Sequence, residues 1–62
     1  MSPLAHRLVA DLRACPRHFA ELVEAHPAVA WRDFLQAWGE VRGLDALGRD
    51  EKGRYVIATP AG

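Results

Sequence analysis

Apolar residues recur with helical spacing through the middle of the chain. Within the segment AVAWRDFLQAWGEVRG, positions i, i+3, i+4, i+7 and i+10 are apolar. They fall within about a third of the circumference of a helix that turns by about 100° per residue. These positions are Trp31, Phe34, Leu35, Trp38 and Val41. The opposite face carries Val29, Arg32, Asp33, Gln36 and Glu40. The pattern predicts one amphipathic helix over residues 28–42, with both tryptophans in the core. The alternative is that Trp31 and Trp38 are exposed anchors for a partner, because tryptophan is enriched in binding hot spots.

A first helix is predicted over residues 3–14. Ser2 can cap it, and Pro3 suits the first helical position, where its missing N–H costs nothing. Pro16 disfavours helical geometry at Cys15, so the helix should end near Ala14. The buried face is marked by Leu4, Leu8 and Leu12. We expect Cys15 to be a small buried residue, as free cysteines often are.

A second, short helix is predicted over residues 18–26, with His18 at the cap position. Its buried face consists of Phe19, Leu22 and Val23. His26 precedes Pro27 and should stop this helix. Only a few residues then separate the second helix from the third, so the two must meet at a steep angle. A short helix, a tight turn and a longer helix with a polar face are typical of a helix-turn-helix.

The C-terminal segment predicts a β-hairpin over about residues 46–58. Asp50 and Gly53 occupy the first and fourth positions of a type I turn, where these residue types are favoured. The run RYVIA that follows is rich in strand-forming residues. Because a lone hairpin is unstable in water, we expect Leu47, Tyr55 and Ile57 to face the helices. Residues 59–62 should form a frayed tail. The predicted fold class is therefore α+β, a three-helix helix-turn-helix core with a C-terminal two-stranded wing.

The order of these segments resembles the winged helix-turn-helix superfamily, and the resemblance covers roughly residues 3–58. The phrase FAELVEAHP corresponds to the second helix and the bend, WRDFLQAWGEVRGL to the recognition helix, and LGRDEKGRYVI to the wing. In that superfamily the third helix usually enters the major groove of DNA, while the wing touches the backbone or minor groove.

The resemblance implies that the chain is a DNA-binding domain, transcription-regulator-like or accessory to a larger regulator, with double-stranded DNA as its partner. It also assigns candidate contacts. Arg32 and Gln36 lie one turn apart on the outward face of the third helix, and their side chains suit guanine and adenine respectively. Cations around the wing and ahead of the second helix would neutralise phosphates. These candidates are Arg17, Arg49, Lys52 and Arg54.

Charge favours a different partner. Eight Lys and Arg residues offset eight Asp and Glu residues, whereas a nucleic-acid-binding protein more often has a basic surplus. Asp33 and Glu40 share the outward face of the third helix, and Asp50 and Glu51 dilute the charge of the wing. The alternative function is therefore protein–protein interaction through a winged helix without DNA. A homodimer is a further possibility, because two half-sites would enlarge a small contact area.

Length and composition narrow the remaining classes. Sixty-two residues allow a single domain, and one cysteine excludes an intramolecular disulfide. We expect no membrane span and no signal peptide, hence a cytoplasmic protein. The three histidines and Cys15 do not match a zinc site, so no metal or cofactor is expected. There is no nucleophile–base pattern and little room for a pocket, so we do not expect an enzyme.

Overall fold

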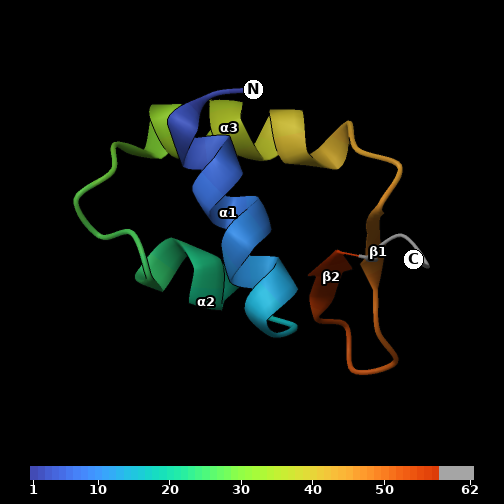
Figure 1. Cartoon of the computed structure of the whole chain (residues 1–62). Coiled ribbons are helices and arrows are strands. Elements are labelled where there is room, and N and C mark those ends of the chain that lie inside the picture. Colours follow the sequence, from blue (N-terminus) through green and yellow to red (C-terminus); the bar gives the residue numbers. More distant parts are fainter. Residues whose placement is uncertain (58–62) are drawn as a thin grey trace.

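Three helices precede two short strands in the computed structural model, which describes residues 1–57 (Figure 1). The elements are α1 (Pro3–Ala14), α2 (Phe19–Glu24), α3 (Trp31–Arg42), β1 (Leu47–Arg49) and β2 (Tyr55–Ile57). The strands form an antiparallel hairpin. The predicted α+β class is thus confirmed, with an arrangement consistent with a helix-turn-helix core and a wing. The tail predicted at residues 59–62 and the last residue of the predicted hairpin lie outside the described residues.

Helix α1 has the predicted bounds because both of its ends are specified locally. The Ser2 hydroxyl accepts a hydrogen bond from the Ala5 N–H at 3.2 Å, and Pro3 opens the first turn. At the other end Cys15 adopts an extended conformation ahead of Pro16. Cys15 is exposed, so the prediction of a buried thiol was wrong. As the residue that ends the helix, Cys15 lies beyond the face that packs on the core.

Helix α2 is shorter than predicted, running from Phe19 to Glu24. His18 occupies the cap position, and its backbone N–H donates to Glu21 Oε1 at 2.9 Å. The chain leaves the helix at Ala25, and the His26 N–H then bonds to the Val23 carbonyl in a tighter turn.

Helix α3 begins at Trp31, three residues later than predicted. The Val29 N–H bonds to the His26 carbonyl, which makes residues 26–29 a turn, and Ala30 is extended. Residues 28–30, predicted to be helical, therefore form part of the α2–α3 connection, and α3 begins at the first residue of the apolar stripe. Val29, expected on the outward face of the helix, instead packs partly buried against the core.

The core is built chiefly from α1 and α3. Its buried members are Ala5, Leu8, Val9, Leu12, Leu22, Phe34, Ala37, Trp38, Val41 and Ile57. Helix α1 lies across α3 and also contacts β2 (Figure 1). Trp38 is 6% exposed, as predicted, but Trp31 is 55% and Leu35 44% exposed, so their placement in the core was wrong. The buried residues of α3 are Phe34, Ala37, Trp38 and Val41, so the buried arc includes the alanine and excludes Leu35 and most of Trp31.

Aromatic side chains join α2, α3 and the wing. The Phe19 ring meets the rings of Phe34 and Trp38 edge-on, at centroid distances of 5.6 and 5.4 Å. Trp38 in turn meets Tyr55 of β2 edge-on at 4.8 Å. Edge-to-face contacts of this kind are worth about 0.5–1.5 kcal/mol beyond the area that they bury. Trp38 therefore holds both the second helix and the wing against α3.

The hairpin pairs Leu47 with Ile57 and Arg49 with Tyr55. Ile57 is buried, and Leu47 and Tyr55 are partly buried against the core, which confirms the predicted inward face. The Gly53 N–H bonds to the Asp50 carbonyl across the predicted turn, and Gly53 has φ of 79°, a conformation that favours glycine.

The wing is also fastened to the segment before α2. Arg17 and Tyr55 exchange two backbone hydrogen bonds, of 3.1 and 2.7 Å, as an isolated antiparallel bridge. The bridge places Arg17 directly beside β2.

Replacing Trp38 by Ala should lower the free energy of unfolding by about 3–5 kcal/mol and unfold much of a chain this small. The physical reason is the loss of a buried ring that contacts both α2 and β2. The matched control, Trp31→Ala, should cost clearly less, because this ring is already 55% exposed. Urea denaturation followed by circular dichroism measures both values. Equal losses in the two variants would contradict this core.

Candidate functional site

The exposed face of α3 presents both polar and large apolar side chains. Arg32 and Gln36 are exposed there, one turn apart, as predicted. Trp31 and Leu35 lie next to them and are also exposed. One side of the Trp31 ring contacts the protein: it stacks on Phe34 at a centroid distance of 5.9 Å and meets the Phe19 ring edge-on at 6.2 Å. This face of α3 therefore presents an exposed indole whose orientation is set by two neighbouring rings.

Within residues 1–57, the predicted cations other than Lys52 have intramolecular partners. Arg54 Nε donates to Asp50 Oδ2 at 2.8 Å, and the Arg49 guanidinium lies 4.9 Å from the centre of the Tyr55 ring. Arg17 Nε donates to the Asp11 carbonyl at 3.3 Å. The Lys52 side chain is exposed. Three of the four side chains assigned to phosphate contact thus already contact other groups of the protein.

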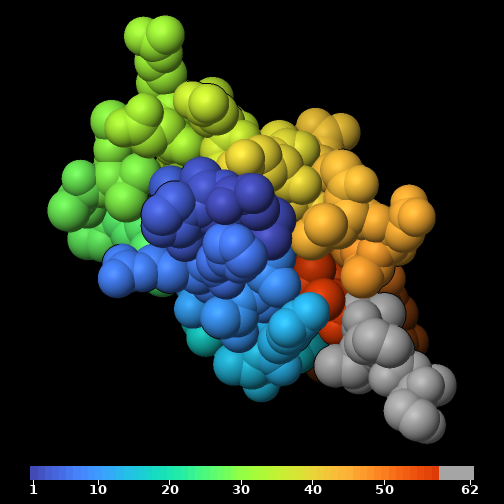
Figure 2. Space-filling model, turned by 45° about the horizontal axis from the view of Figure 1, so that its top comes forward, coloured from blue at the N-terminus to red at the C-terminus, as the bar shows by residue number. Residues whose placement is uncertain are grey.

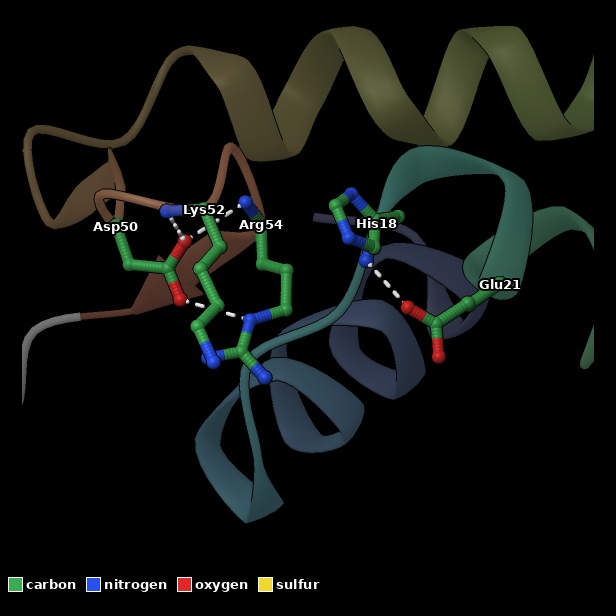
Figure 3. A network of polar contacts seen from close by, with 5 residues as sticks. All are labelled: His18, Glu21, Asp50, Lys52 and Arg54. Atoms are coloured by element: carbon green, nitrogen blue, oxygen red, sulfur yellow. Dashed lines mark hydrogen bonds and ion pairs between the residues drawn. The ribbon is translucent and has the colours of Figure 1, made fainter.

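Asp50 organises the tip of the wing (Figure 3). Its Oδ1 accepts from the backbone N–H groups of Lys52 and Arg54, at 3.0 and 2.8 Å. Partial burial would by itself raise the pKa of Asp50. Hydrogen bonds from the Arg54 backbone and side chain and from the Lys52 backbone oppose it and leave the pKa below its ordinary value. The carboxylate therefore serves mainly to fix the turn.

The predicted DNA contacts belong to different elements of the fold. Helix α3 lies along one edge of the molecule in Figure 1, and the turn between β1 and β2 lies at the opposite edge. Arg32 is in the first turn of α3, whereas the wing follows the other end of that helix. Arg17, Arg49 and Arg54 do come together, because the Arg17–Tyr55 bridge adds a third segment beside the wing.

Glu40 is held at the side of α3 by the start of α1. Its carboxylate accepts from the Ser2 hydroxyl at 2.7 Å and from the Ser2 backbone N–H at 3.3 Å. The side-chain bond from Ser2, followed by the backbone bond, lowers the pKa of Glu40. An ionised carboxylate is therefore a permanent part of the exposed α3 surface at neutral pH.

An open groove of about 640 Å³ lies between the start of α1, the α2–α3 connection and α3. Figure 2 shows the first residues of α1 between the α2–α3 connection and α3. A chain of this length was expected to have little room for a pocket, and this groove is larger than that expectation. Its walls are mostly apolar, and Ser2, Asp33 and Gln36 supply the polar side chains. They include no nucleophile next to a base, so the groove offers shape without a catalytic arrangement.

Asp11 and His26 form a contact that the sequence pattern did not predict. Asp11 Oδ2 lies 2.9 Å from His26 Nε2, and the imidazole is 12% exposed. The pair joins α1 to the turn that leads into α3. Because the two residues are fifteen positions apart, no local sequence pattern indicates that they meet. The contact ties the bend of the helix-turn-helix to α1.

Among residues 1–57, no group of three His, Cys, Asp or Glu side chains is placed to hold a metal ion. No helix within the same residues is long and apolar enough to cross a membrane.

Comparisons of the chain with known protein families, with characterised proteins and with solved structures gave no match. The function must therefore be argued from the surfaces described above.

The Asp50 carboxylate should stabilise the fold in a pH-dependent way. Because its folded-state pKa is lowered, the contribution is complete above the ordinary aspartate pKa and is lost as pH falls through the lower folded value. Asp50→Asn should therefore be less stable than the parent protein at neutral pH. The difference should shrink below about pH 4. Urea titrations of both proteins from neutral to acid pH measure it, and a difference that persists unchanged in acid would contradict this role.

Proposed function

We propose that this chain is a protein-interaction module that binds another polypeptide through the exposed face of α3. The observation that carries the proposal is the exposure of Trp31 and Leu35, at 55% and 44%, side by side on one helix. Tryptophan is enriched among residues that dominate binding energy, and adjacent exposed apolar side chains are typical of contact surfaces. The contacts of Trp31 with Phe19 and Phe34 support this reading, because a pre-ordered ring loses little entropy on binding.

Charge also favours a polypeptide partner. The chain has no net charge, and the Arg54, Arg49 and Arg17 side chains already have partners within the fold. A phosphate-binding surface gains affinity from cations that are free to displace counterions. A cytoplasmic location is part of the proposal, since the free, exposed Cys15 suits a reducing compartment.

A photo-crosslinking residue placed at Leu35 tests this proposal in cells that produce the full chain. We expect a single covalent product, identified by mass spectrometry, that is lost when Trp31→Ala is added. The matched control carries the same photo-crosslinker at Glu24, which is exposed on α2. Equal crosslinking at the two positions, or a product that is independent of Trp31, would argue against binding through α3.

DNA binding is the second candidate, and the exposure of Arg32 and Gln36 on α3 favours it. Arg32 forms no ion pair with any residue in the range 1–57, so its charge is available to a phosphate or a guanine. The helix-turn-helix order of α2 and α3 would present this face to a major groove. Both functions need the same face of α3.

Fluorescence anisotropy with a labelled random duplex, at about 50 and 200 mM salt, tests DNA binding. Binding should weaken steeply as salt rises. Arg32→Gln should lower the affinity and reduce the slope of log K against log salt by about one. Arg13→Gln, which removes an exposed cation from α1, is the control and should change less. Folded protein that does not bind at low salt would exclude general DNA affinity.

A further inference from the structure

Two parallel rows of exposed residues run along the outward face of α3. The first row consists of Trp31, Leu35 and Gly39, and the second consists of Arg32, Gln36 and Glu40. Residues four apart in a helix form such rows, and two helices pack by fitting these rows together. The two ends of the first row differ in size, and the two ends of the second row differ in charge. These differences determine how a second α3 could pack against this face.

The first row has opposite sizes at its ends. Trp31 has the largest side chain in the row, whereas a Cβ built on Gly39 would meet no atom of the described residues within 4 Å. Both lie four residues from Leu35, or about 6 Å along the axis at about 1.5 Å per residue. If a second α3 runs antiparallel with Leu35 on the two-fold axis, Trp31 of each copy faces Gly39 of the other. Leu35 then packs on its own counterpart.

The second row has opposite charges at its ends. Arg32 and Glu40 are each four residues from Gln36. In the same antiparallel arrangement Arg32 of each copy lies about 3 Å along the axis from the level of Glu40 of the other, at about 1.5 Å per residue, and an arginine side chain can span that offset. A parallel arrangement would oppose like charges. Ser2 holds the Glu40 carboxylate from the side through hydrogen bonds to both of its oxygens. A carboxylate has about four acceptor positions, so an arginine can still be bound.

We propose that the polypeptide bound by α3 is a second copy of this chain, in an antiparallel two-fold dimer centred on Leu35. The proposal rests on the proposed function and names its partner. An isologous interface requires a surface that is complementary to itself. The first row meets that requirement in the register centred on Leu35, and the second row meets it with an offset of about 3 Å. A neutral chain adds no net repulsion between copies. A chain of this size also gains from burying apolar surface in an oligomer.

Sedimentation equilibrium of the purified chain, from about 1 µM to about 1 mM, tests the dimer. The mass should rise with concentration from 6.9 kDa toward twice that value. Gly39→Leu fills the slot opposite Trp31 and should weaken dimerisation about tenfold or more. The monomer should keep its stability, because Gly39 is an exposed helical position at which leucine is the better helix former. Arg32→Glu should also weaken the dimer, and more so at low salt.

Disulfide trapping tests the register in a Cys15→Ser background. Leu35→Cys should form a disulfide dimer on mild oxidation, because the two sulfurs would meet at the two-fold axis. Arg42→Cys is the matched control on the same helix. In the proposed register the two copies of residue 42 lie about 20 Å apart along the axis, at about 1.5 Å per residue. Selective trapping through Leu35→Cys supports the dimer.

Three results would overturn the dimer: a monomer up to about 1 mM, no effect of Gly39→Leu, or equal trapping at both cysteine positions. They are distinguishable from failure of the proposed function. A monomer whose Leu35 photo-crosslinker captures a different protein in a Trp31-dependent way overturns self-association and leaves the interaction module standing. A monomer that also gives no Trp31-dependent product overturns both.

Discussion

The edge-on packing of the Trp38 indole between Phe19 and Tyr55 is the contact on which the other elements depend. Helix α2 has six residues, and the strands have three each, so none of them is stable alone. Helix α2 and strand β2 each gain a large aromatic contact with Trp38 of α3, and β1 is held by its pairing with β2. The described residues contain no disulfide or metal group that could take over this role.

Short polar contacts complete the fold at its connections. Ser2 caps the N-terminus of α1 and also binds Glu40, so one residue begins the first helix and connects it to the third. Asp50 fixes the tip of the wing, and the Arg17–Tyr55 bridge fixes its base. Asp50 also pairs with the Arg54 guanidinium, so the wing has less free positive charge than its sequence indicates. The apolar face of α3 therefore becomes the most distinctive surface of the described residues.

The exposed residues of α3 are those that lie outside the part of its circumference covered by the core. The buried arc of α3 is filled by Phe34, Ala37, Trp38 and Val41. Leu35 lies outside this arc, while Trp31 lies at its edge above Phe19. Both remain available to a partner, next to Arg32 and the Ser2-bound Glu40. The surface is thus apolar at its centre and charged at its margin, the composition of many protein interfaces.

The sequence by itself determined the α+β class, the bounds of α1, and the hairpin with its inward residues. These features follow from local rules: Ser2 and Pro3 start a helix, Pro16 prevents its continuation, and Asp50 and Gly53 form a turn. Tertiary structure alone decided that α3 begins at Trp31, that Trp31 and Leu35 are exposed, and that Asp11 meets His26. The reason is that periodicity identifies an apolar stripe but not the angle at which another helix crosses it. Here α1 packs on α3, and Ala37 is buried with Phe34, Trp38 and Val41, while Trp31 and Leu35 at one edge of the stripe remain exposed.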